Sequence, residues 1–137
     1  MDQEGYRSLL DTALAARKLA YAPYSGFKVG AALLCADGTV YTGCNIENAA
    51  YTPTNCAERT AFFKAVSEGR RDFTAMAIVG GKSAVDALCP PCGVCRQVMM
   101  EFCGKDFEII LGTDQGQLQV YTLETLLPQG FGPGSLH

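Results

Sequence analysis

The sequence predicts an α/β fold: a three-layer α-β-α sandwich around a mixed five-stranded sheet. The chain of 137 residues is long enough for one domain and leaves little room for a second. Hydrophobic residues make up 48% of it and charged residues 18%, a balance typical of a folded domain with a buried core. Helix-like and strand-like patterns follow in the order α-β-β-α-β-α-β-β-α, which indicates a mixed sheet with helices on both faces.

The first third of the chain predicts a helix followed by a β-hairpin. Pro23 disfavours helical geometry in the residue before it, so the helix is expected to end near Ala22. An Asp-Gly turn at 37–38 separates two runs of strand-like residues, 28–36 and 39–45, and such a turn favours a hairpin. Residues at amphipathic helical spacing are Tyr6, Leu9, Leu10, Ala13 and Leu14.

The rest of the chain predicts alternating helices and strands and then an irregular tail. The expected elements are a helix from near Cys56 to Gly69, a strand over 74–80, a helix from Cys92 to Gly104, strands over 107–111 and 118–121, and a short helix over 122–127. From about residue 128 the chain is rich in Gly and Pro, and no regular structure is expected there.

Charge and hydropathy count against two classes of partner. The net charge is −3 and the 11 basic residues are scattered, whereas a nucleic-acid groove needs them clustered. No apolar run reaches the roughly 18 residues of a membrane span. The acidic start over residues 1–4 lacks the basic and apolar regions of a secretory signal. We therefore expect a cytoplasmic protein that binds neither nucleic acid nor membrane.

Histidine and cysteine counts narrow the chemistry. The one histidine is the last residue, His137. Because the ends of a chain are often poorly ordered, we do not expect its imidazole to be catalytic. An odd number of cysteines, seven, in a reducing compartment favours metal ligands or buried thiols over a disulfide framework. We expect Cys35, Cys44 and Cys103 to be buried thiols, because their surroundings are apolar.

The pair Cys92 and Cys95 has Cys-x-x-Cys spacing at the predicted start of a helix. Alone, this pair fits a redox dithiol, a structural zinc site or a catalytic metal site. Cys56 starts another predicted helix, and the positive end of a helix stabilises thiolates. Two converging helix starts would supply three thiolates to a tetrahedral Zn²⁺ and leave the fourth position for water. Glu58 follows closely enough to face the metal without binding it.

Cys89 makes a second kind of zinc site possible, one that is closed to water. Together with the other three thiolates it would complete a four-sulfur structural zinc site that has no place for water. The two prolines between Cys89 and Cys92 hold the backbone extended, which turns Cys89 away from a shared tetrahedron. A closed site would also give Glu58 no role.

Four segments carry a family resemblance. Residues 54–59 and 91–97 resemble the zinc-binding signature of cytidine deaminases in their small, all-thiolate form, within the cytidine and deoxycytidylate deaminase superfamily. Residues 24–32 and 43–49 resemble that family's substrate-binding stretches, and the likeness extends over roughly residues 5 to 131. It implies that residues 1–137 form a single domain of this fold. It also implies a homotetramer whose active sites are shared between subunits.

The resemblance implies a role for each site residue. Glu58 would be catalytic, Arg59 would bond the sulfurs, and Cys56, Cys92 and Cys95 would hold one Zn²⁺ per subunit. From the residues alone, Phe27 suits the core and Asn45 and Glu47 suit strand-end caps. The resemblance instead places Phe27 on the pyrimidine and the other two on the ribose 3′-hydroxyl. The implied substrate-binding residues are Phe27, Asn45, Glu47, Ala49, Tyr51, Ala57 and Phe131, the last reaching a neighbouring site from the tail.

The implied activity is hydrolytic deamination of cytidine and 2′-deoxycytidine to uridine, 2′-deoxyuridine and ammonia, in pyrimidine salvage. Zinc lowers the pKa of water towards about 7, and a carboxylate beside it can carry the proton to the leaving amine. One alternative is a deaminase of a related aminopyrimidine or modified nucleoside. Another is a non-catalytic zinc-binding module, which would leave Glu58 unexplained.

Overall fold

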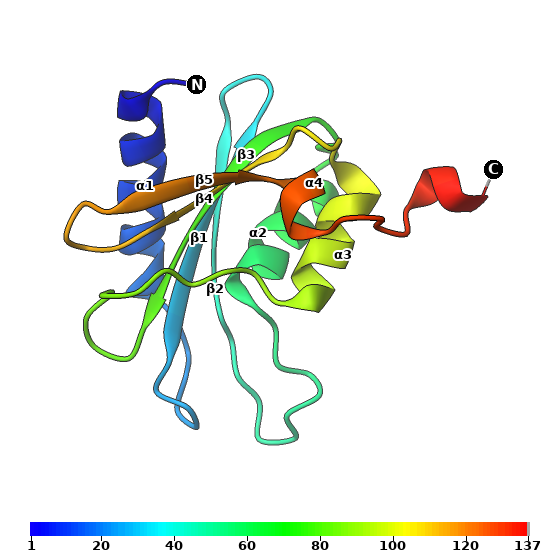
Figure 1. The fold of residues 1–137 in the computed structure, drawn as a ribbon. Helices are drawn as coiled ribbons and strands as arrows, with labels where there is room; N and C mark the ends of the chain where they lie inside the picture. The colour runs from blue at the N-terminus through cyan, green and yellow to red at the C-terminus, as the bar shows by residue number, and fades with distance from the viewer. Residues whose placement is uncertain (137) are drawn as a thin grey trace.

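The computed structural model describes residues 1–136 and contains one mixed sheet in the order β2-β1-β3-β4-β5 (Figure 1). Its strands are β1 (Lys28–Cys35), β2 (Val40–Cys44), β3 (Phe73–Gly81), β4 (Glu108–Gly112) and β5 (Leu118–Thr122). β3 and β4 pair in parallel, and every other neighbouring pair is antiparallel. The expected mixed five-stranded sheet is confirmed.

Helices cover both faces of this sheet. They are α1 (Gln3–Arg17), α2 (Ala57–Ser67), α3 (Gly93–Phe102) and α4 (Leu123–Leu126). Alternate residues of β1 enter two separate cores, because side chains of a strand point to opposite faces. Ala32 packs in the core under α1, whereas Ala31 and Leu33 pack in the core that α2, α3 and α4 share. This is the predicted three-layer α-β-α arrangement, with α1 alone on its face (Figure 1).

The first helix ends earlier than the sequence predicts, at Arg17 instead of near Ala22. The next three amides, of residues 18–20, donate to carbonyls three residues back, which tightens and closes the last turn. Tyr21 then leaves the helix and pairs with the segment that follows β2. Its N–H donates to the Asn45 carbonyl at 2.9 Å, and its carbonyl accepts from the Glu47 amide at 2.8 Å. The pairing of Tyr21 with the segment after β2 therefore decides where the helical part of the chain ends.

The tail also departs from expectation. Residues 128–132 are irregular, as predicted, but Pro133–Leu136 form a short 3₁₀ helix. Ser135 closes this turn, since its hydroxyl accepts from the Gly132 amide at 3.1 Å and its own amide donates to the Gly132 carbonyl at 2.9 Å. The expectation for His137 lies outside the described residues.

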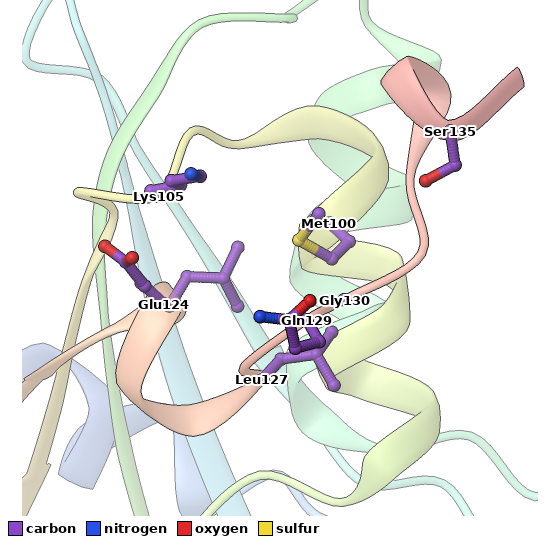
Figure 2. A pocket seen from close by; sticks show the side chains of 8 residues that line it. Met100, Lys105, Glu124, Leu127, Gln129, Gly130 and Ser135 are labelled. Carbon is purple, nitrogen blue, oxygen red and sulfur yellow. The ribbon is translucent and has the colours of Figure 1, made fainter. Parts of the chain in front are cut away.

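The tail lies beside α3 and α4 and helps to enclose a pocket of about 390 Å³ (Figure 2). Figure 2 shows Lys105 and Glu124 on one side of it and Ser135 of the tail on the other, with Met100 of α3 and Gln129 of the tail between them. The side chain of Gln97 fixes the tail by donating to the Phe131 carbonyl at 2.6 Å. The residues that line this pocket include none of those expected to bind metal or substrate.

Close packing of β2 against α2 fixes where α2 begins. A Cβ added at Gly43 would lie only 2.6 Å from the Ala61 amide nitrogen, so a larger residue would push the helix away. Gly43 thus lets the first turns of α2, which follow Cys56, lie directly on the strand. Among residues 1–136, no helix combines the length and apolar character needed to cross a bilayer.

Candidate metal centre and active site

Three cysteine sulfurs converge where two helices begin. Cys56 is the N-cap residue of α2, Cys92 is the N-cap residue of α3, and Cys95 lies in the first turn of α3. The three Sγ atoms all lie within 4.8 Å of one another. The Cys92 sulfur is 3.7 Å from that of Cys56 and 3.5 Å from that of Cys95. The structure therefore brings together the three thiols that the sequence singled out.

The local structure leaves these thiols free to face one another. Neither N-cap cysteine bonds an amide of its own helix through its side chain. The unpaired amides and the dipole of each helix start still favour negative charge there. Hydrogen bonds from Cys95 and Arg59 lower the pKa of Cys56 to about 5, although burial opposes this shift. The hydrogen bond to Cys56 and burial raise the pKa of Cys95.

Arg59 supplies a positive charge beside the sulfurs. Its Nη2 donates to Cys56 Sγ at 3.2 Å. Its Nε is buried and finds no hydrogen-bond partner among the described residues. Three thiols with a cation against them are a donor set that suits Zn²⁺, because this ion prefers thiolate sulfur and three thiolates on it leave a net negative charge. The cluster is thus capable of binding the metal.

Cys89 is not one of the converging sulfurs within the described part of the chain. Its side chain lies against the backbone of β3, where a Cβ added at Gly80 would lie 2.8 Å from Cys89 Sγ. Burial raises the pKa of the Cys89 thiol to about 11, so this thiol is protonated near neutral pH. This placement supports the open three-sulfur arrangement over the closed four-sulfur one.

Glu58 is a buried carboxyl group, only 4% exposed, in the first turn of α2. Burial raises its pKa to about 7. It lines a cavity of about 210 Å³ that also reaches the cysteine cluster. The wall of this cavity contains Asn45, Cys56, Ala57, Glu58, Cys89 and Cys92. A carboxyl group, two of the three thiols and a small cavity therefore adjoin one another.

The remaining expected substrate residues do not all line this cavity. Glu47 and Tyr51 line an adjoining hollow of about 450 Å³, which shares Thr54 with the smaller cavity. Phe27 is 38% exposed, so it is not the core residue that the sequence alone suggested. A Cβ at Gly80 would lie 3.0 Å from the Phe27 ring and also touch Cys89, so the ring lies near the wall that Cys89 forms.

Two expected residues lie on exposed parts of the chain. Ala49 lies in an exposed turn after β2. Phe131 is 59% exposed on the tail, and its backbone rather than its ring is held. Neither lines the cavity of Glu58 within this chain. Conversely, Ser25 and Thr54, which line the hollow beside Glu47, were not individually predicted to bind substrate, because a hydroxyl in a loop carries no signal of its own.

Comparison with known proteins agrees with this geometry. Residues 3–111 match the model of the cytidine and deoxycytidylate deaminase zinc-binding region. The chain is 56% identical to a cytidine deaminase of Halalkalibacterium halodurans over 124 residues, which cover 90% of this chain and 91% of that protein. It is 53% identical to a cytidine deaminase of Sporosarcina psychrophila, over 88% of this chain and 87% of the relative.

Solved structures show the same fold. The crystal structure of cytidine deaminase from Burkholderia pseudomallei superposes with a TM-score of 0.86 at 47% identity, covering 96% of this chain and all (100%) of that one. The cytidine deaminase of Mycobacterium tuberculosis gives a TM-score of 0.79 at 40% identity, over 93% of this chain and 97% of that one. With the family signature falling on the convergent cysteines, the chain belongs to the cytidine and deoxycytidylate deaminase family.

Proposed function

We propose that this chain is a zinc-dependent cytidine deaminase that acts on free nucleosides in pyrimidine salvage. It would hydrolyse cytidine and 2′-deoxycytidine to uridine and 2′-deoxyuridine and release ammonia. One observation carries the proposal: the buried carboxyl group of Glu58 shares a small cavity with the convergent cysteines. Relatives and structural neighbours that bear the name cytidine deaminase support the choice of substrate.

Cys56, Cys92 and Cys95 would hold one Zn²⁺ per chain. A zinc ion bound there would make water a usable nucleophile near neutral pH. Arg59 would offset the surplus negative charge of three thiolates through its hydrogen bond to Cys56, and the two helix starts would add to this effect.

Glu58 would carry the proton. Ammonia leaves the ring only if the amine is protonated. Glu58 can take the two protons of the attacking water in turn and pass one to the ring nitrogen, where the product keeps it, and the other to the amine, which leaves as ammonia. The pyrimidine would lie in the cavity beside Ala57 with Phe27 on its face, and Asn45 and Glu47 would bind the ribose. No other carboxyl group lines this cavity among residues 1–136.

The ultraviolet spectrum of the nucleoside tests this function. Zinc-loaded protein incubated with cytidine should convert its spectrum to that of uridine, because loss of the 4-amino group changes the chromophore. Uridine in the same assay should show no change and serves as the control. An unchanged cytidine spectrum would contradict the proposal. Turnover of cytosine or a modified nucleoside in place of cytidine would instead favour the alternative deaminase.

We also propose that the protein is a homotetramer whose subunits share active sites, and that it works in the cytoplasm. Exposed aromatic rings on Tyr51 and Phe131 support this assembly, since aromatic residues are enriched in interfaces between protein chains. In a tetramer, Ala49, Tyr51 and Phe131 would complete the site of a neighbour. The seven free cysteines suit the reducing conditions of the cytoplasm.

Light scattering at assay concentration tests the assembly. The expected mass is about four times the chain mass of 14.6 kDa. Phe131→Ala should then raise KM for cytidine without lowering the mass, because the ring would reach a neighbour's site. A wild-type mass near that of a single chain would contradict the tetramer.

A further inference from the structure

We infer that Ser25 is a positioning residue for the nucleoside: its hydroxyl holds the carboxylate of Glu47 and the backbone of Phe27 in one arrangement before substrate enters. The inference rests on the proposed function, which gives Glu47 and Phe27 their contacts with substrate.

Ser25 lies in the turn between α1 and β1, and its hydroxyl makes two bonds at once. It donates to Oε2 of Glu47 and accepts from the Phe27 amide at 2.9 Å. The other carboxylate oxygen, Oε1, accepts from the Ser25 amide at 3.1 Å and from the Tyr24 amide at 2.9 Å. Three donors on two consecutive residues thus fix a carboxylate 22 positions further along the chain.

Asn45 holds the backbone on the C-terminal side of Ser25, at Phe27 and Val29. Its Nδ2 donates to the Phe27 carbonyl at 2.8 Å, and its Oδ1 accepts from the Val29 amide at 2.8 Å. Both polar backbone groups of Phe27 are therefore held, the N–H by Ser25 and the C=O by Asn45. Asn45, which is expected to bind ribose, thus also fixes the backbone of Phe27, the residue expected to stack on the base.

The number of bonds on Glu47 limits how it can meet a ligand. A carboxylate offers about four acceptor positions, and three of them are occupied here. The remaining one can accept from one ribose hydroxyl. A carboxylate already fixed in this way loses less side-chain freedom when substrate binds, so the arrangement raises affinity. The Ser25 hydroxyl also lowers the pKa of Glu47, because it bonds the ionised form.

The experiment compares Ser25→Ala and Ser25→Thr with the zinc-loaded wild-type chain. Ser25→Ala should raise KM for cytidine by about tenfold and change kcat by less than about threefold, as expected for the loss of a charge-assisted bond outside the reacting atoms. Ser25→Thr keeps the hydroxyl and should restore KM to within about threefold of wild type. Ser8→Ala, at an exposed serine of α1, is the matched control and should leave both constants unchanged.

A double-variant cycle and a titration separate positioning from mere stability. Since Ser25 acts partly through Glu47, its KM effect should shrink when Glu47→Gln is already present. The pKa of Glu47, followed by carbon NMR, should rise in Ser25→Ala and stay low in Ser25→Thr. An unchanged KM in Ser25→Ala, or an unchanged pKa of Glu47, would overturn the inference. If wild-type protein left cytidine unconverted, the proposed function would fail, and the pKa of Glu47 alone would decide whether Ser25 holds that carboxylate.

Discussion

Glu58→Gln should lower kcat for cytidine by about 10²–10⁴-fold or more. The amide keeps the shape of the side chain and can still form hydrogen bonds, but it cannot take a proton from water and pass it on. Glu58 would serve both water activation and protonation of the leaving amine, so the loss should reach the upper end of that range. The described part of the cavity offers no other carboxyl group to replace it.

Zinc content and thermal stability are the companion measurements, because Glu58 is not one of the converging ligands. Both should match wild type, and cytidine should still bind. Glu101→Gln, which changes an exposed glutamate of α3, is the matched control and should retain wild-type turnover. Turnover of Glu58→Gln within about tenfold of wild type, at full zinc occupancy, would remove Glu58 from the mechanism.

Local patterns were sufficient for most of the fold. Helical spacing in the first 17 residues and the Asp-Gly turn both reflect interactions between near neighbours, and both a first helix and the β1–β2 hairpin formed as predicted. The end of α1 could not be predicted in the same way. It depends on the pairing of Tyr21 with Asn45 and Glu47, more than 20 residues away, and no local signal marks that contact. The 3₁₀ turn closed by Ser135 was missed for a different reason: its hydrogen bonds are local, but a segment rich in Gly and Pro is not expected to form regular structure.

In the candidate site, too, some residues could be predicted from the sequence and others could not. The thiols and Glu58 could be singled out because few residue types perform their chemistry and because each stands at a predicted helix start. Ser25 could not, since a serine in a turn most often bonds only its own loop. Its importance depends on a carboxylate brought to it by the sheet, and only the folded chain shows that bond. The structure likewise moved Phe27 from an expected core position to an exposed one beside the site.

Cys92→Ser should abolish zinc binding and, with it, deamination. A serine hydroxyl remains protonated near neutral pH and is a poor zinc ligand, whereas thiolates bind this ion well. Loss of a partner that only bonds a ligand costs about 10–100-fold in metal affinity, so loss of a ligand itself should cost more. Zinc content measured by elemental analysis after gel filtration should fall close to zero, and cytidine turnover should fall in proportion.

Cys89→Ser separates the two possible metal sites. The Cys89 sulfur lies against Gly80 and outside the cluster formed by Cys56, Cys92 and Cys95, so its replacement should leave one zinc ion per chain. Cys89 also lines the cavity beside Glu58, and for that reason zinc content rather than turnover is the measurement that decides. If Cys89→Ser lost its zinc as Cys92→Ser does, the metal would be held by four thiolates. Such a centre has no position for water, and Glu58 would then have no reaction to serve.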